Sequence, residues 1–207
     1  MRNLIASVSF VLIVVAGTCC VSCGSEVDPF RKNDCPASKT TTYSLSENEK
    51  GIVTYSGYDT LKFIQWPSNA IYTFNGKGKV IGYKDVQVTS MITYCPDNIA
   101  KCEYRNFVFE SQILNNELFV SIYEEGLLDA SQAKFVFQEF SAECSIGSLF
   151  AQPTYSTITV RGIPYKDVHR ITPNGSITDT STYLLYTVKE GVIKIKISQN
   201  EYWEKIQ

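Results

Sequence analysis

Apolar and polar residues alternate over short stretches along most of the chain. Between Val192 and Ile197 the residues Ile193, Ile195 and Ile197 occupy every second position, with lysines between them. Such a period of two is typical of a β-strand with one face buried and the other in water. Residues of the same β-branched and aromatic character predict strands at 60–66, 71–74, 79–94, 103–111, 117–123, 133–140, 156–161, 167–172, 182–189 and 192–198.

Turn-forming dipeptides separate many of these stretches. They are Asn75-Gly76, Asn115-Asn116, Glu125-Gly126, Asn174-Gly175 and Glu190-Gly191. Helical crossovers of the length that a parallel sheet needs are missing, so the pattern favours antiparallel pairing. The expected fold is mainly β: an antiparallel sandwich or an open half-barrel of about ten short strands.

One helix start stands out before the strands. Ser46 followed by Glu49 fits a capping box, in which each side chain satisfies a backbone N–H of the other residue. We therefore expect a single short helix that ends near Gly51. The polar, proline-punctuated residues 24–42 read as a tether in front of the domain.

The N-terminus has the layout of an export signal. Arg2 precedes an apolar block of about a dozen residues, too short to span a membrane comfortably. Cleavage by an ordinary signal peptidase before Cys19 is one reading; a half-cystine role for Cys23 is another. The reading that explains more is a lipid-modified Cys23, which divides the chain into a signal peptide (1–22), an anchored tether (23–42) and one β domain (43–207).

Ser22-Cys23 and the following Gly-Ser-Glu-Val-Asp resemble the lipobox and acidic export tag of Gram-negative outer-membrane lipoproteins. By that resemblance Cys23 carries three acyl chains and holds the protein at the cell envelope. Stable anchoring takes two or more acyl signals, so such an anchor is effectively permanent. The membrane is then a partner through the anchor, on either the periplasmic or the surface side.

Four further cysteines follow Cys23, an even number that predicts two disulfides in an exported chain. Three pairings are open. The turn-rich CPDNIAKC favours a clasp between Cys95 and Cys102, which leaves Cys35 for Cys144. A tetrathiolate zinc site is the alternative, but it needs two close cysteine pairs and the chain has one. We expect no metal and no cofactor.

Charge and the rarer residues narrow the function without fixing it. The net charge of −2 is spread along the chain, which argues against nucleic acid as a partner. The single histidine, His169, shares a strand face with Asp167, yet no nucleophile motif accompanies it. A carboxylate pair for glycoside hydrolysis leaves almost no sequence trace, and candidates here are Glu103, Glu110, Glu117, Glu124, Glu139 and Glu143.

Aromatic residues are the remaining candidates for binding. Trp66, Tyr155 or Trp203 would form a platform for a sugar face if exposed, whereas in most β folds such residues fill the core. Asn174-Gly175-Ser176 matches a glycosylation sequon, but Asn-Gly is also a favoured hairpin turn.

The segments Tyr165–His169 and Tyr186–Lys194, with the later Trp203, resemble the C-terminal hairpins of small Gram-negative lipoproteins; Ser46–Phe63 resembles the start of those domains. That family carries no established activity, so the resemblance implies an envelope lipoprotein only. Three functions stay open: a non-catalytic module that binds an unknown protein or glycan, a carrier for an apolar ligand, and a carboxylate-based hydrolase. A solid core favours the first and an apolar cavity the second.

Overall fold

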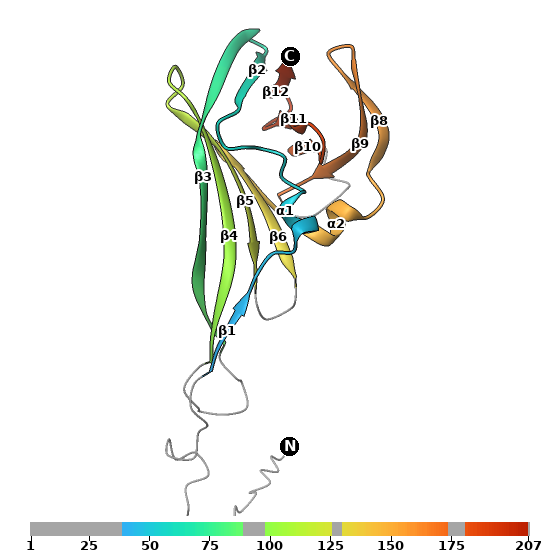
Figure 1. Ribbon diagram of the computed structural model, residues 1–207. Coiled ribbons are helices and arrows are strands. Elements are labelled where there is room, and N and C mark those ends of the chain that lie inside the picture. The colour runs from blue at the N-terminus through green and yellow to red at the C-terminus, as the bar shows by residue number, and fades with distance from the viewer. Residues whose placement is uncertain (1–38, 89–97, 126–129, 174–180, 207) are drawn as a thin grey trace, which may run out of the picture.

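The computed structural model describes residues 39–88, 98–125, 130–173 and 181–206, and these residues form a curled antiparallel half-barrel (Figure 1). This confirms the expected fold class and selects the half-barrel over the sandwich. The helices are α1 Glu47–Lys50 and α2 Ile146–Phe150. The strands are β1 Thr40–Tyr43, β2 Thr60–Trp66, β3 Ala70–Val88, β4 Asn98–Ser111, β5 Asn116–Glu124, β6 Ser131–Phe137, β7 Phe140–Ser145, β8 Tyr155–Val160, β9 Ile163–Ile171, β10 Tyr183–Thr187, β11 Gly191–Lys196 and β12 Tyr202–Ile206.

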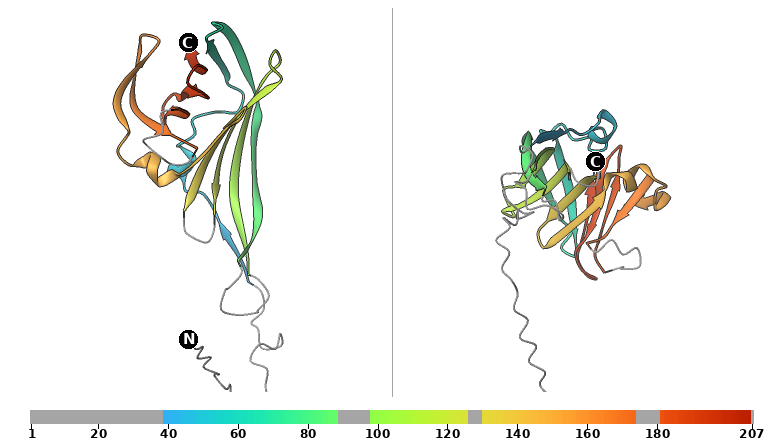
Figure 2. Two further views of the ribbon diagram at one scale, coloured as in Figure 1. Left: turned by 180° about the vertical axis from the view of Figure 1, so that it is seen from behind. Right: turned by 90° about the horizontal axis from the view of Figure 1, so that it is seen from below.

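Two meanders meet to make the sheet. The strand order is β7-β6-β5-β4-β3-β2-β12-β11-β10-β9-β8, so each strand pairs with its sequence neighbour except where β12 joins β2. Strand β1 pairs with β4 in parallel, beside the long β3–β4 hairpin. Helix α2 connects the two outermost strands of this order, β7 and β8. It is the orange helix at the base of the β8–β9 hairpin in the left view of Figure 2.

The concave face of the sheet carries the core. Strand β6 alternates strictly between buried and partly exposed residues, with Phe135 and Phe137 pointing inward. Trp203 of β12 is fully buried, and its ring lies against Phe74 and Phe137. Trp203 is therefore a core residue, and its interpretation as an exposed sugar platform is wrong.

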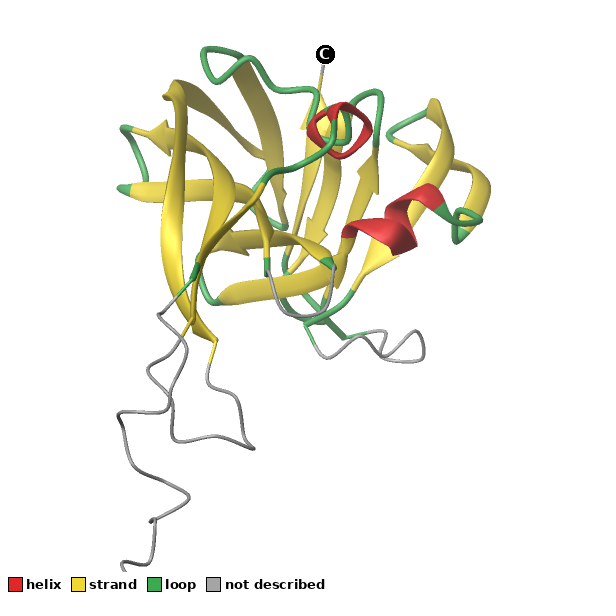
Figure 3. Cartoon of the chain, turned by 60° about the horizontal axis from the view of Figure 1, so that its bottom comes forward, coloured by secondary structure: helices red, strands yellow, loops and turns green. Residues whose placement is uncertain are grey.

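Residues 44–59, here called the inner segment, cross the concave face between β1 and β2 (Figure 1). Helix α1 lies in this segment, and its capping box is formed as expected: Glu49 N–H donates to Ser46 Oγ, and Ser46 N–H donates to Glu49 Oε2. Figure 3 shows α1 and α2 as the two helices beside the strands. Leu45 and Ile52 are buried in the core, so the inner segment fills the half-barrel.

Two tyrosine hydroxyls tie the inner segment to the C-terminal hairpin. Tyr186 Oη donates to the carbonyl of Ile52 at 2.6 Å, and the N–H of Val192 donates to Tyr55 Oη at 2.7 Å. Gly191, with φ of +72°, is needed here, because a Cβ would lie 2.2 Å from Tyr55 Oη. At the other end, Leu45 N–H donates to the buried carboxylate of Glu103.

The structure departs from the expected strands in specific places. Asn75-Gly76 is not a turn: β3 runs through it, and the register shifts between Gly76 and Lys79 as in a bulge. Strands β1, β7 and β12 and helix α2 were not predicted. The described helices are all short, and none is long and apolar enough to cross a membrane.

Candidate functional site

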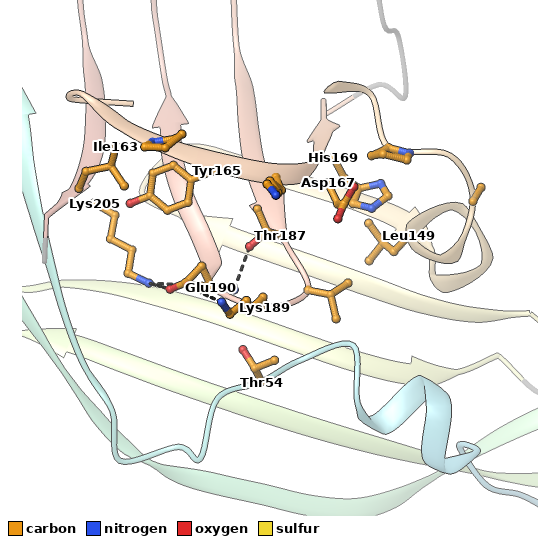
Figure 4. Close-up of a pocket in the computed structure, with 15 residues that line it drawn as sticks. Thr54, Leu149, Ile163, Tyr165, Asp167, His169, Thr187, Lys189, Glu190 and Lys205 are labelled. Carbon is orange, nitrogen blue, oxygen red and sulfur yellow. Dashed lines mark hydrogen bonds and ion pairs between the residues drawn. The ribbon is translucent and has the colours of Figure 1, made fainter. Parts of the chain in front are cut away.

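A pocket of about 910 Å³ opens between the inner segment, strand β9 and the turn that joins β10 to β11 (Figure 4). Its wall combines apolar residues of β9 and α2 with threonines and charged side chains. The residues that line it are Thr54, Leu149, Ala151, Pro153, Ile163, Pro164, Tyr165, Lys166, Asp167, His169, Thr187, Val188, Lys189, Glu190 and Lys205. The pocket is thus built from helix α2, the meander β8–β12 and the segment that fills the core.

Hydrogen bonds hold the turn on one side of the pocket. Thr187 Oγ1 accepts from the N–H of Glu190 at 2.8 Å, and Lys205 Nζ donates to the Glu190 carbonyl at 2.7 Å. The same ammonium lies 3.7 Å from the Glu190 carboxylate. Burial lowers the pKa of Lys205, while the Glu190 charge opposes that shift. The turn and its lysine form a fixed wall in which the two opposite charges face one another.

Asp167 and His169 lie on the opposite wall, on β9 (Figure 4). His169 is 7% exposed, whereas Asp167 is exposed and adopts φ of +52°. Burial lowers the pKa of His169, and the Asp167 carboxylate raises it only in part, so the imidazole is neutral at pH 7. The structure brings this sequence-predicted pair to one pocket, and it places a residue in the sparsely populated left-handed region there.

His169 also borders a second, smaller pocket that contains Cys144. Burial raises the pKa of Cys144 to about 11, so the thiol stays protonated near neutral pH. A thiolate nucleophile of the Cys-His type is therefore not available at this position.

Neither predicted disulfide is present among the residues that the structure describes. Cys102 is buried in β4 as a free thiol, and Cys144 of β7 is also free. Their expected partners, Cys35 and Cys95, lie outside the described ranges, so the two bonds stay predictions without support. Cys23 and the signal peptide also lie outside these ranges.

The three aromatic candidates do not come together. Trp66 is 44% exposed at the end of β2 and stacks on Tyr202 with ring centroids 5.9 Å apart. Tyr155 of β8 packs against the small cluster around Val168, and Trp203 is buried. None of the three lines the large pocket.

Sequence reasoning missed most of the pocket. Thr54 and Lys205 are 151 positions apart in the sequence. They line the same pocket because β12, which carries Lys205, pairs with β2 next to the inner segment, which carries Thr54. Two signals in the sequence pointed to parts of the pocket: the pair Asp167 and His169, and the dipeptide Glu190-Gly191, which is a hairpin turn as predicted. The histidine, the cysteines and the carboxylates form no group able to hold a metal ion in the described ranges.

Comparisons with protein-family models, with curated proteins and with solved structures find no match for this chain.

Proposed function

We propose that the protein is a non-catalytic binding module of the cell envelope, anchored by a lipid on Cys23, and that it binds a neutral glycan in the large pocket. The observation that carries the proposal is the make-up of that pocket. It offers hydroxyl groups and an aromatic ring beside charges that already face one another.

The charges of the pocket favour a ligand without net charge. The Glu190 carboxylate lies within 4.0 Å of the ammonium groups of both Lys189 and Lys205. The lining also contains one further carboxylate, Asp167, and one further ammonium, Lys166, while His169 is neutral at pH 7. A strongly anionic or cationic ligand would have to separate the Glu190–Lys205 pair, which costs free energy in a partly buried site. A sugar needs no such separation, because its hydroxyls both donate and accept hydrogen bonds.

The shape of the wall supports the same class of ligand. Thr54 presents an exposed hydroxyl from the inner segment (Figure 4). On the β9 side the pocket is lined by the exposed Pro164 and by Tyr165, which is largely buried in the small cluster. Sugar rings combine apolar C–H faces with polar edges, and aromatic or proline surfaces pack against such faces.

The two alternatives have less support. A carrier for an apolar ligand needs an empty interior, but Leu45, Ile52, Val53 and Tyr55 of the inner segment occupy the concave side. A hydrolase needs an activated nucleophile or an acid placed against a substrate. The Thr187 hydroxyl, beside Glu190, is part of the turn, and the Cys144 thiol is protonated.

The pocket is tested by titrating the full chain with a panel of neutral oligosaccharides in a calorimeter. Thr54→Val removes one exposed hydroxyl and keeps the shape of the side chain, so we expect binding to weaken by about tenfold, the worth of one hydrogen bond in a binding site. Thr157→Val, an exposed threonine of β8 outside the pocket, is the matched control and should leave the affinity unchanged. Equal loss in both variants, or no binding by any member of the panel, contradicts the glycan proposal.

Catalysis and anchoring have separate readouts. If the protein releases free sugar from a bound oligosaccharide, and if His169→Asn abolishes that release, the protein is a hydrolase and the non-catalytic proposal is wrong. Displacement of a fluorescent fatty acid by an apolar ligand would favour the carrier.

Cys23→Ser should move the protein from the membrane fraction to the soluble fraction and abolish labelling by a fatty-acid analogue. Retention of this variant in the membrane fraction would contradict the lipid anchor.

A further inference from the structure

The lower half of β3 has an unpaired edge. From Lys79 to Val88 the strand pairs with β4 on one side, while its pairing with β2 on the other side ends at Asn75. No other described strand pairs with these residues, here called the open edge (79–88). Val80, Ile81 and Tyr83 are each at least half exposed, at 54%, 50% and 52%.

The inner segment explains why this edge is open. Backbone pairing beyond β2 continues only as far as Gly78 N–H, which donates to the carbonyl of Gly57 at 2.8 Å. The chain before Gly57 turns inward, where Tyr55 joins the core. Filling the half-barrel therefore removes the residues that would extend β2 along β3 (Figure 1). The result is a long strand edge with exposed β-branched and aromatic side chains, the kind of edge that pairs with another strand.

The backbone limits how two such edges can pair. Successive residues of a strand direct their N–H and C=O groups to opposite sides, so only every second residue of β3 offers them to the open edge. In an antiparallel pair, two residues that exchange hydrogen bonds must both face the partner. When two copies of one edge pair by twofold symmetry, one residue must therefore lie directly opposite its own copy. The axis is at that residue and not at a point between two successive residues.

Side-chain chemistry then selects one residue for the axis. With the axis at Gly82, Lys79 of each copy faces Asp85 of the other, and Ile81 faces Tyr83. The four side chains Lys79, Ile81, Tyr83 and Asp85 share one face of β3, so both the ion pairs and the apolar pairs form on the same side.

The neighbouring axes fail. An axis at Lys84 puts two lysines against each other, an axis at Tyr83 sets Ile81 against Asp85, and an axis at Ile81 leaves Lys79 against Tyr83. Within the described part of the chain Lys79 and Asp85 form no ion pair with other residues. Both charges are therefore available for a partner.

We propose that the protein forms a twofold dimer in which the open edges of two copies pair antiparallel about Gly82, so that two half-barrel sheets become one continuous sheet. The interface is isologous, with Lys79–Asp85 and Ile81–Tyr83 each occurring twice. This inference is independent of the glycan proposal, because none of these residues lines the large pocket.

The first experiment needs no variant. The full chain, solubilised in detergent, is treated with a carbodiimide, which joins an ammonium and a carboxylate in direct contact through an amide bond with loss of water. We expect a linked dimer whose peptide map contains Lys79 joined to Asp85. That amide must be intermolecular, because six residues of strand span about 20 Å. A dimer linked elsewhere, or monomer alone, overturns the proposal.

Charge reversal provides the second experiment, read as the dissociation constant from sedimentation of the same full chain. Lys79→Asp and Asp85→Lys each create two like-charge pairs across the axis, so each should weaken association by about tenfold or more. The double variant Lys79→Asp/Asp85→Lys restores opposite charges and should recover the dimer. Lys62→Asp, an exposed lysine of β2 outside the edge, is the control. The Gly82 register is contradicted if the double variant does not regain the original dissociation constant, or if the control loses as much affinity as the single variants. A dimer whose dissociation constant is the same in all four variants is held together by another surface, which also contradicts the proposal.

Discussion

The two halves of β3 show how one strand can serve opposite purposes. The upper half, residues 70–76, pairs with β2 as far as Asn75 and with β4 only at Asn75 and Gly76. Its Phe74 is fully buried against Phe63, Phe137 and Trp203. The lower half pairs only with β4 and leaves Ile81 and Tyr83 half exposed. Both halves contain β-branched and aromatic residues, but the charged residues Lys79, Lys84 and Asp85 all belong to the lower half. The lower half also has no neighbour on the β2 side, because the chain before Gly57 turns inward to the core.

The largest effect should come from truncating the upper half. Phe74→Ala removes a buried ring from an aromatic cluster, and we expect it to lower the free energy of unfolding by about 3–5 kcal/mol. Ile81→Ala, seven residues along the same strand, should change it by less than about 0.5 kcal/mol in the monomer. Urea unfolding at a protein concentration below the dissociation constant measures both. Similar losses in the two variants would mean that the open edge is covered.

The second-largest loss of stability is expected from a variant that frees the inner segment. Tyr186→Phe leaves the buried Ile52 carbonyl without its hydrogen-bond donor, so we expect a loss of about 1–3 kcal/mol. The hydroxyl occupies little volume, and packing should therefore change little. Urea unfolding is again the measurement, and hydrogen exchange would show faster opening around Ile52. An unchanged stability would indicate that this hydroxyl does not hold the inner segment in place.

His169 in the large pocket should make a smaller contribution to the free energy of unfolding, and this contribution should depend on pH. The pKa of His169 in the folded state lies below its ordinary value of 6.5, because burial disfavours the charged imidazole. Below pH 6.5 the unfolded chain therefore binds more protons at this residue than the folded chain, and stability falls as the pH drops from 6.5 through the lower folded pKa. Above pH 6.5 the contribution is constant.

His169→Asn removes this titration and serves as the comparison in unfolding measurements between pH 5 and pH 8. Its stability should depend less on pH in the window just below 6.5 than that of the unaltered chain. Identical slopes for the two proteins would show that His169 is not desolvated in the folded state.

The smallest effect is expected at the surface aromatic pair. Trp66→Ala removes a half-exposed ring that stacks on Tyr202, and the free energy of unfolding should change by less than about 1 kcal/mol. Trp203→Ala, the other tryptophan, should cost about 3–5 kcal/mol because its ring is fully buried. Tryptophan fluorescence checks the contrast further, since Trp203 should be shielded from a water-soluble quencher and Trp66 should not.

Local patterns predicted much of the secondary structure. Thr60–Trp66 was predicted with its observed bounds, and the capping box of Ser46 and Glu49 is formed as expected. These features depend on near neighbours in the sequence: alternation for a strand, and a three-residue spacing for the cap. The antiparallel arrangement also followed, because the connections are too short for parallel crossovers.

Local signals failed where distant contacts compete with them. Asn75-Gly76 has the chemistry of a hairpin turn, but pairing with β4 carries β3 straight through it as a bulge. Strand β12 was missed because Tyr202–Ile206 is a short and highly charged stretch that becomes a strand between β2 and β11. In both places the free energy comes from partners far away in the sequence.

The sequence by itself determined the fold class, the short cap-started helix and the residues that alternate between core and water, because each depends on local geometry and on the preference of apolar side chains for burial. Only the tertiary structure decided that Trp203 lies in the core, that Thr54 and Lys205 meet at one pocket, and that β3 has an open edge. The reason is the inner segment: its path across the concave face is set by long-range packing of Leu45, Ile52 and Tyr55, which no spacing in the sequence records.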